Sequence, residues 1–521
     1  MPKFNRLNLK SPCFDLAWLI MPSNNRNGEK CFVLMPGGGG TTKSGVTNAI
    51  FVASDSKVPG TFEYLNSFPT GDLLCNSIST GSIRDTTIIC ASFDELCHLY
   101  SVKLENDGQL SFKQVAEFTA DYCQDQASVN CSVIISRAGS AGYVITGGED
   151  GKCRVWIATK QDNGIWLVSK KSELTGHTGP IMSLSVSSPQ WDSSTTRVSG
   201  GVDEYWLVTG SRDGTIRMWN VRSSKLLNEI KLETINDSRA EAKEVVKRGR
   251  KIVPPTPAQL QLQCRGCVFS ADASCLFYIQ SASRGGTFLI KAELTANVKD
   301  INDRDGTAHI ESDVGVGVGI ELPRKSVIGT VSSKVMKYTV VSTTPSTRLR
   351  SSDWFTGHKA AQLLVVGGSD GSLSVFRQHD LSLVLRLSQV HDFPVTGLAF
   401  RPPSLGAQAI ARLDLPERSE VLALIEKSAK DEVTLVSCSA DNKFISVQVS
   451  TNKKKRSWCY LFAVSFFMFL FLLGLAIIFL EERHIEMMAD IIEKTASVLP
   501  TSETVHNQHQ ALIPKNTDAE L

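Results

Sequence analysis

His177, Ser211 and Asp213 have the residue types that a hydrolase triad combines: a general base, a nucleophile and an acid that orients the base. Ser211 does not lie in the Gly-x-Ser-x-Gly turn that exposes the nucleophile in one large class of hydrolases. It stands instead beside the pair Asp213-Gly214, which is typical of a tight turn between two strands. We therefore interpret these residues as part of a strand turn and its hydrogen bonds.

Residues 37–44 nearly match the phosphate-binding loop Gly-x4-Gly-Lys-Ser/Thr. Thr42 occupies the position of the second glycine, and Lys43 and Ser44 complete the pattern. A phosphate loop opens a helix, whereas residues 45–48 lead into an apolar stretch typical of a strand. The pattern therefore does not favour nucleotide hydrolysis. Two interpretations stay open: a flexible surface linker, or a loop whose exposed carbonyls are shaped around an ion or a partner.

The thirteen cysteines are scattered, and only Cys264 and Cys267 form a C-x-x-C pair. A zinc site needs a second such pair or two histidines at ligand spacing, and the sequence has neither near this pair. We expect two reduced thiols on a buried strand.

The elements that position these residues belong to a chain of 521 residues, of which 42% are hydrophobic. Its formal net charge is only +2. That balance excludes a globally polybasic nucleic-acid binder and a mostly disordered acidic chain. The 38 glycines and 19 prolines suit a globular β-rich protein.

One unit recurs through residues 1–450: an apolar stretch, a tight turn with Asp or Gly, and an alternating strand. The clearest copy is Leu207–Asn220, and the others lie at 31–53, 88–100, 144–156, 276–294, 365–371 and 435–442. Hairpin units in series indicate a β-propeller, so we predict an all-β fold with seven blades. A strand near Phe14–Met21 is expected to join the last blade and close the ring.

The repeats carry further marks. Gly176-His177 and Gly357-His358 are Gly-His pairs, and Trp219-Asn220 stands near the end of the clearest copy. The unit resembles the WD-repeat family, of which this chain is a divergent member. In that family a histidine, a Ser or Thr, the turn aspartate and the tryptophan hydrogen-bond within one blade. The resemblance implies that His177, Thr209 or Ser211, Asp213 and Trp219 do so here.

Two polar stretches, residues 220–263 and 295–325, are predicted to be long loops. Within the first, residues 239–251 have the composition of a short basic helix or of a solvated loop.

Residues 458–480 contain no charged side chain and are dominated by Phe, Leu, Ile, Val and Ala. As a helix they would reach about 34 Å, enough to cross a bilayer. Residues 451–457 form a basic linker before them, and Glu481-Glu482 follow. The positive-inside rule then places residues 1–457 in the cytosol and the tail, residues 481–521, on the other side. The start of the sequence lacks the apolar region of a secretory signal.

In the tail, Ile485, Met488 and Ile492 share a helical face, so the helix is expected to continue past the membrane. The last four residues, 518–521, loosely resemble a retrieval signal of the Lys-Asp-Glu-Leu type, with two mismatches.

Residues 37–48, Gly-Gly-Gly-Gly-Thr-Thr-Lys-Ser-Gly-Val-Thr-Asn, resemble the glycine-rich catalytic loop of a membrane-anchored propeller family. Its members are the prolactin regulatory element-binding protein and the fungal and plant exchange factors for the Sar-type small GTPase. The likeness extends over the chain: the loop in the first blade, a divergent propeller, one membrane span near the end and a lumenal tail.

The resemblance implies a guanine nucleotide exchange factor in the endoplasmic-reticulum membrane. Such a protein performs no covalent chemistry; it promotes GDP release and GTP loading on the Sar-type GTPase, which then recruits the COPII coat. By resemblance, Asn48 is the principal exchange residue and Ile50 its apolar neighbour. The family loop is ordered by a potassium ion held by backbone carbonyls, which here would be those of Gly37, Gly38, Gly39, Gly40, Thr41, Thr42, Lys43, Ser44 and Gly45.

Two alternatives belong to other functional classes. One is a non-catalytic, membrane-anchored scaffold that binds peptides or coat proteins. The other is a transcriptional role, because one family name mentions DNA; the balanced charge and the membrane span argue against nucleic acid as a partner.

Overall fold

A computed structural model of the chain describes residues 3–22, 29–40, 45–56, 60–136, 141–187, 205–233, 262–270, 273, 275–282, 287–294, 327–333, 338–343, 362–402, 432–450 and 458–498. The chain divides into two compact units, Met1–Thr451 and Asn452–Leu521, which we describe separately.

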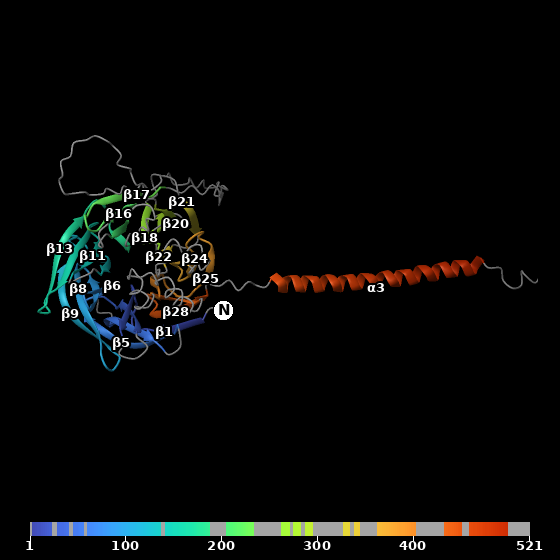
Figure 1. Cartoon of the computed structure of the whole chain (residues 1–521), viewed down its shortest axis with the longest axis horizontal. Helices are drawn as coiled ribbons and strands as arrows, with labels where there is room; N and C mark the ends of the chain where they lie inside the picture. Colours follow the sequence, from blue (N-terminus) through green and yellow to red (C-terminus); the bar gives the residue numbers. More distant parts are fainter. Residues whose placement is uncertain are drawn as a thin grey trace, which may run out of the picture. The chain divides into compact units, whose positions relative to one another are not determined.

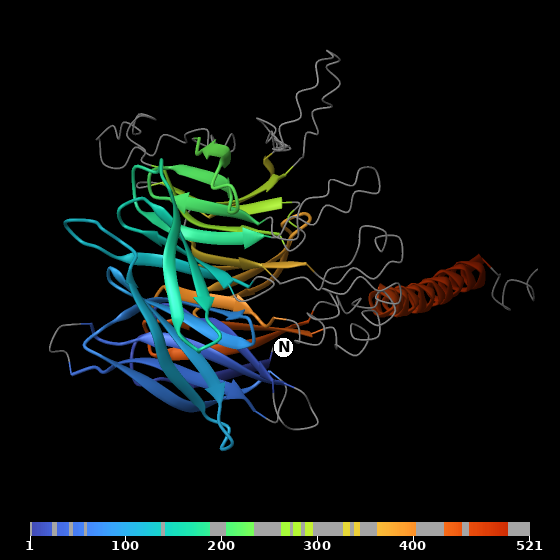
Figure 2. The same ribbon diagram turned by 60° about the vertical axis from the view of Figure 1, so that its left-hand side comes forward.

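The first unit is a ring of antiparallel sheets around a central axis (Figure 1). Its described residues form seven sheets of four strands, which confirms the predicted seven-bladed β-propeller. Each sheet is one blade, and Figure 2 shows the blades from the side. The first strand of a blade is the innermost. These inner strands contact one another in sequence around the axis.

The first four blades, each from its inner to its outer strand, have the following bounds. Blade 1 is β2(Ala17–Pro22), β3(Glu29–Gly37), β4(Asn48–Asp55) and β5(Phe62–Gly71); blade 2 is β6(Cys75–Ile83), β7(Thr86–Phe93), β8(Leu96–Leu104) and β9(Leu110–Thr119); blade 3 is β10(Val129–Ile135), β11(Ala141–Gly148), β12(Cys153–Lys160) and β13(Trp166–Leu174); blade 4 is β14(Ile181–Ser187), β15(Trp206–Ser211), β16(Thr215–Asn220) and β17(Leu226–Lys231).

The remaining blades follow the same order, and the last one takes its outer strand from the start of the chain. Blade 5 is β18(Leu262–Phe269), β19(Cys275–Ala282), β20(Thr287–Glu293) and β21(Val327–Ser333); blade 6 is β22(Tyr338–Thr343), β23(Leu363–Gly368), β24(Leu373–Arg377) and β25(Leu383–Leu387); blade 7 is β26(Val395–Phe400), β27(Glu432–Ser439), β28(Lys443–Ser450) and β1(Lys3–Asn8).

The ring closes differently from the prediction. The strand that pairs with β28 is β1, in the register Lys3↔Gln448 to Asn8↔Lys443. Most of the predicted closing segment, Phe14–Met21, belongs instead to β2, the inner strand of blade 1. β1 is mostly polar: Leu7 packs against the core between blades 7 and 1, whereas Phe4 is exposed.

The core lies between blades, not inside one continuous centre. Each hydrophobic cluster joins two neighbouring blades, and successive residues of a strand belong to opposite clusters. In β15, for example, Leu207 packs toward blade 3 while Trp206 and Val208 pack toward blade 5. The strands are buried on both faces and therefore read as continuous apolar runs.

The polar stretch 220–263 is not a loop throughout, because β17 lies within it as the outer strand of blade 4. Residues 234–261, with the predicted basic segment 239–251, lie outside the described residues, as does the stretch 295–325.

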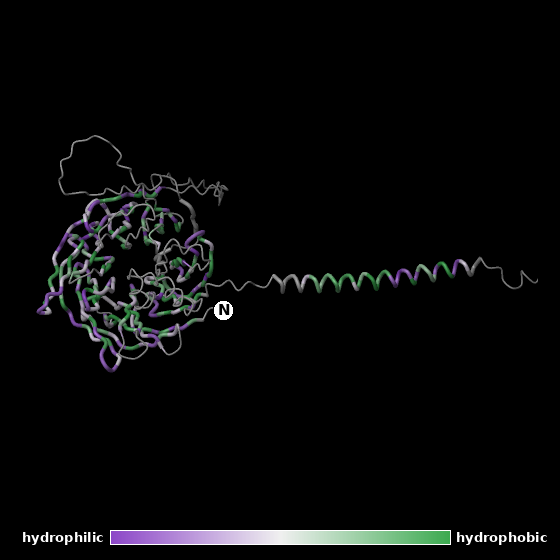
Figure 3. Tube along the Cα trace, viewed as in Figure 1, coloured by the Kyte–Doolittle hydropathy of each residue, from purple (hydrophilic) through white to green (hydrophobic). Residues whose placement is uncertain are grey.

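The second unit contains the helix α3(Trp458–Val498), which has 41 residues. It is long and apolar enough to cross a membrane, by length and composition. Figure 3 shows a hydrophobic first part and a second part in which hydrophilic and hydrophobic residues alternate. The predicted span 458–480 falls in the first part, and the helix continues past it as predicted.

Candidate functional site

The turns between second and third strands lie at the same end of the blades as the connectors from one blade to the next, because the strands are antiparallel. We call this end of the ring the upper face. In blade 4 its turn is the short segment 212–214, whereas in blade 1 it is the glycine-rich segment 38–47. The prediction that this segment replaces a tight turn of the propeller is confirmed.

The glycine-rich loop is held at its base by the connector between β1 and β2, residues 9–16. The N–H of Gly38 donates to the carbonyl of Pro12 (3.0 Å), and Ser11 Oγ donates to the carbonyl of Thr47 (3.1 Å). Cys13 forms an isolated bridge with Gly37. The connector thus fixes both ends of the loop. Residues 41–44, the middle of the loop, lie outside the described residues.

Asn48 is the first residue of β4 and is only 3% exposed. Its Oδ1 accepts from the N–H of Gly40 (3.1 Å), and its Nδ2 donates to the carbonyls of Gly40 (3.3 Å) and Gly71 (3.2 Å). The side chain therefore ties the loop to the end of β5. The resemblance implies that Asn48 is the principal exchange residue; in the structure its side chain is buried and positions the loop.

Gly38 makes this arrangement possible. Its φ is +150°, and a Cβ there would lie 2.1 Å from Asn48 Oδ1 and 2.7 Å from Asn48 Cα. Any larger residue would push the Asn48 amide away from its partners.

Ile50 lies two residues farther along β4 and has no exposed surface. It packs in the cluster between blades 1 and 2. The expectation that Ile50 contacts a partner is therefore corrected: in this structure it is a core residue. Strand alternation places Ile50 and Asn48 on the same side of β4, but only the strand end reaches the loop.

Four exposed side chains with large apolar parts lie on the upper face, in the loop or in connectors between blades. Val46 lies in the loop itself, Leu73 in the connector to blade 2, Tyr122 in the connector to blade 3 and Phe393 in the connector to blade 7. Tyr122 and Phe393 are 56% and 55% exposed. We call these four residues the apolar arc; it spans four consecutive blades, with the loop in the middle.

The other large apolar side chains exposed in the described propeller lie elsewhere. They belong to outer strands or to the β12–β13 turn at the opposite end: Phe4, Tyr64, Ile165, Leu167, Leu226 and Leu383. Apolar residues grouped on one face of a ring mark a protein-binding surface more readily than scattered ones.

Blade 4 shows what the predicted triad residues do. His177 Nε2 and Trp219 Nε1 both bond Thr209 Oγ1, at 2.7 and 3.0 Å. His177 Nδ1 lies 3.1 Å from Asp213 Oδ2. The hydrogen-bonded tetrad implied by the WD-repeat resemblance is confirmed, with Thr209 as its hydroxyl member.

Ser211 is not bonded to His177; its Oγ accepts from the backbone N–H of Asp213 (3.1 Å). It is fully buried, and its Oγ donates to the carbonyl of Gly179 (2.9 Å). A Gly-x-Ser-x-Gly pattern does occur at residues 367–371, but there it forms the turn between β23 and β24 and not a strand-to-helix elbow. Neither serine has the surroundings of a hydrolase nucleophile.

Burial raises the pKa of Asp213, but hydrogen bonds from His177, Thr215 and the Thr178 amide lower it more, so its pKa lies well below the usual range. The carboxylate is therefore ionised and holds the turn to the histidine. We call such a hydrogen-bonded set of His, Ser or Thr and turn Asp a clasp.

Blade 7 contains a second clasp that the sequence analysis missed. His391 Nε2 bonds Ser437 Oγ (2.9 Å), and its Nδ1 lies 3.1 Å from Asp441 Oδ1. Burial lowers the pKa of His391. The spacing could have revealed it, because His391 precedes β26 by as many residues as His177 precedes β14. The predicted Gly357-His358 mark falls outside the described residues.

Two further sequence motifs do not form the sites that their patterns suggest. The phosphate-loop pattern leads into β4 and not into a helix, as expected. Cys264 and Cys267 are buried on β18, where a bulge interrupts the strand between them. Among the described residues no group of three or more His, Cys, Asp or Glu side chains could hold a metal ion.

Comparison with known proteins supports the fold class. The family described as "WD domain, G-beta repeat" matches residues 168–220, which include most of β13 of blade 3 and the three inner strands of blade 4, β14 to β16. The chain is also 32% identical over 111 residues to mitochondrial division protein 1 of two strains of Saccharomyces cerevisiae. That match covers 21% of this chain and only 14% of the length of those relatives.

Proposed function

We propose that this chain is a guanine nucleotide exchange factor for a Sar-type small GTPase at the endoplasmic-reticulum membrane, where it starts COPII coat assembly. The observation that carries the proposal is the glycine-rich loop of blade 1, anchored at both ends on the upper face inside the apolar arc. The resemblance of residues 37–48 to the exchange loop of that family supplies the identity of the partner.

The proposed mechanism is differential binding. An exchange factor must bind the nucleotide-free GTPase more tightly than the GDP-bound form. The ratio of these two affinities is the coupling factor, the factor by which the exchange factor weakens GDP binding. The apolar arc would supply affinity common to both forms. The loop, which belongs to a central blade of the arc, would supply the difference by displacing the switch segments that hold magnesium and phosphate.

Within this mechanism Asn48 acts through the loop. Because its side chain is buried, it positions the loop backbone through Gly40 and does not itself contact the GTPase. A loop held in its bound shape before association loses less conformational entropy on binding.

The residues of the loop fit a potassium ion chemically. Backbone carbonyls and the hydroxyls of Thr41, Thr42 and Ser44 are the neutral oxygen donors that suit this cation, and residues 37–48 contain no carboxylate. The carbonyls of residues 37–45 would hold the ion, which would order the loop. The described carbonyl of Gly40 already accepts a hydrogen bond from Asn48, so ion and side chain would order the same segment.

The helix α3 would act as the anchor. Lys453–Arg456 before it favour a cytosolic propeller and a lumenal tail. Anchoring raises the effective concentration of the propeller at the membrane on which the GTPase works.

A nucleotide-release assay tests the proposal. The propeller unit, residues 1–451, is mixed with a Sar-type GTPase loaded with fluorescent GDP, and release is followed after addition of excess GTP. We expect release to accelerate at least tenfold, roughly the size of a typical coupling factor. Replacing potassium by lithium should reduce this acceleration if the ion orders the loop.

An unrelated small GTPase serves as the control. Binding to the Sar-type GTPase without faster release would reject exchange activity and favour the scaffold alternative. Absence of binding would reject the Sar-type GTPase as the partner.

A further inference from the structure

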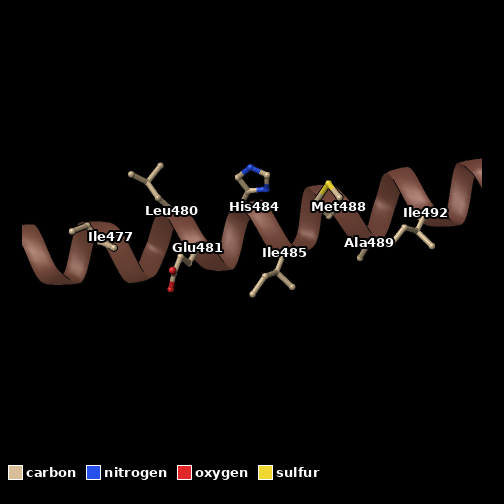
Figure 4. A pocket seen from close by; sticks show the side chains of 8 residues that line it. All are labelled: Ile477, Leu480, Glu481, His484, Ile485, Met488, Ala489 and Ile492. Carbon is tan, nitrogen blue, oxygen red and sulfur yellow. The ribbon is translucent and has the colours of Figure 1, made fainter.

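The part of α3 that follows the apolar span separates its residues by face. Glu481–Val498 continue the helix for about 27 Å. A shallow groove runs along one side of it, lined by Glu481, His484, Ile485, Met488, Ala489 and Ile492 (Figure 4). Ile485 and Ile492 are 69% and 64% exposed. Water-exposed isoleucines in a row are unfavourable unless something covers them.

The apolar face follows a seven-residue repeat that begins inside the span. Phe471, Ile478, Ile485 and Ile492 recur every seven residues and would occupy the first core position, a, of a coiled-coil heptad. Gly474, Glu481, Met488 and Thr495 would occupy the second core position, d. We call these eight residues the seam.

Charged residues of the extension keep away from the seam, with one exception. Glu486, Asp490, Glu493 and Lys494 fall at outer heptad positions, and Lys494 is paired with Asp490 on its own helix (2.8 Å). Glu481, at the edge of the span, is the exception. A single polar residue at a core position lowers the stability of a coiled coil but specifies its register.

We propose that α3 pairs along this seam with α3 of a second copy of the chain. The two helices would form a parallel two-stranded coiled coil that continues without interruption from the membrane span into the extension. Isoleucine at consecutive a positions with Leu at d favours two strands; here three successive a positions are isoleucine, and Met488 is the long apolar residue at d. If α3 crosses a membrane, all copies point the same way, so the pair is parallel and in register.

Two further features favour a second copy as the occupant. Gly474 lies on the seam within the span, and a Cβ there would meet nothing within 4 Å, so a neighbouring helix can approach closely. The extension is too short to be a stable coiled coil in water by itself, but confinement in one membrane supplies the missing effective concentration.

Cysteine cross-linking in the full chain tests the pairing. The native Cys459 in α3 is first replaced by serine, and the protein is purified into phosphatidylcholine vesicles that contain no other protein. Ile485→Cys and Ile492→Cys are compared with the neighbouring outer positions, Glu486→Cys and Glu493→Cys, under mild oxidation. We expect at least tenfold more cross-linked dimer at the seam positions than at the outer ones, roughly as disulfide geometry demands.

A second measurement does not depend on disulfides. Energy transfer between differently labelled copies should fall when Ile485→Asp and Ile492→Asp are combined, and should stay unchanged for Glu486→Gln combined with Glu493→Gln. Helix content by circular dichroism shows that each variant still forms α3.

Several outcomes would overturn the proposal. Equal cross-linking at all four positions would mean random collision, and none at any would mean a monomer. Cross-links in native membranes to a different protein, with no dimer in pure vesicles, would assign the seam to that partner. Failure of the exchange assay would leave the pairing result unaffected, because it concerns the other unit of the chain.

Discussion

Two segments occupy the same place in two blades of the upper face, and they are held in opposite ways. The β15–β16 turn of blade 4 is clasped by side chains: His177, Thr209, Asp213 and Trp219 bond one another. The β3–β4 loop of blade 1 is held through its own backbone, by Pro12 and the Ser11 hydroxyl of the connector and by the single amide of Asn48.

The difference indicates different roles. In blade 4 the polar groups of the clasp satisfy one another within the blade, so they contribute to stability and have little left to offer a ligand. In blade 1 the stem is fixed while the chain between its ends is longer than any turn requires. A rigid scaffold that presents an anchored loop is the usual design of a binding site.

The largest effect is expected where the loop depends on one side chain. Asn48→Ala removes three hydrogen bonds of the loop stem. We expect GDP release from the Sar-type GTPase to slow by about 10²-fold, equivalent to roughly 2.7 kcal/mol of lost transition-state stabilisation. The unfolding free energy should also fall, by about 1–3 kcal/mol, because buried partners lose their bonds.

Stopped-flow release, well below the melting temperature, measures the first quantity, and chemical unfolding measures the second. Asn48→Asp is the matched control, because it keeps the acceptor for Gly40 and loses the donor. If Asn48→Ala releases GDP as fast as the unaltered chain while folded, the loop is not the exchange element.

Thr209→Val tests the other side of the comparison. The substitution removes the hydroxyl that bonds His177 and Trp219 and keeps the shape of the side chain. Two buried groups lose their shared partner, so the unfolding free energy should fall by about 2–3 kcal/mol. GDP release should change by less than about twofold, because distant sites act independently. If Thr209→Val slowed GDP release as much as Asn48→Ala does, the two blades would be coupled.

Two glycine variants separate loop strain from displacement of Asn48. Gly38→Ala and Gly45→Ala both place a side chain at positive φ, at a cost of about 1 kcal/mol at Gly45 (φ +72°) and about 1–3 kcal/mol at Gly38, whose φ of +150° lies outside the left-handed helical region. Only at Gly38 would the new Cβ strike Asn48; at Gly45 it meets nothing within 4 Å. We expect Gly38→Ala to slow GDP release about tenfold more than Gly45→Ala. Equal rates would show that the Asn48 contact does not set the loop.

Acid should weaken the hydrogen bonds of Asp213 in blade 4, and this is the smallest effect. The connector that holds the loop contains Asp15, whose pKa burial raises to about 6, so the test compares variants and not the stability of each blade. Asp213 has a lowered pKa in the folded chain, so its stabilisation is present above the unfolded pKa, about 4, and is lost as pH falls below it. The destabilisation caused by Asp213→Asn should therefore shrink between pH 7 and pH 3, as measured by unfolding. The destabilisation caused by Asn48→Ala should stay constant, because residues 37–48 contain no carboxylate.

Local patterns in the sequence predicted the strands and turns of the propeller well. Leu207–Asn220 showed an apolar run, an Asp-Gly turn and an alternating strand, and they form β15 and β16. The apolar segments on either side of the glycines were correctly predicted as consecutive strands of the first blade. These features depend on residues near one another in the chain, so the sequence alone suffices.

The errors all concern contacts between distant residues. Lys3–Asn8 is too polar to stand out as a strand, and only its pairing with β28 makes it one. Asn48 looked like a loop side chain because its partner Gly71 lies at the end of β5, 23 residues away.

By itself, the sequence determined the all-β repeat, the seven blades, the apolar helix near the end and the glycine-rich loop of the first blade, because period, turn chemistry and hydrophobic length are local properties. Only the tertiary structure decided which strand closes the ring, that Ile50 belongs to the core between two blades, and that Asn48 faces inward to hold the loop. The physical reason is burial: whether a polar amide meets water or a backbone partner depends on what the rest of the chain places beside it, and here that is Gly40 and Gly71.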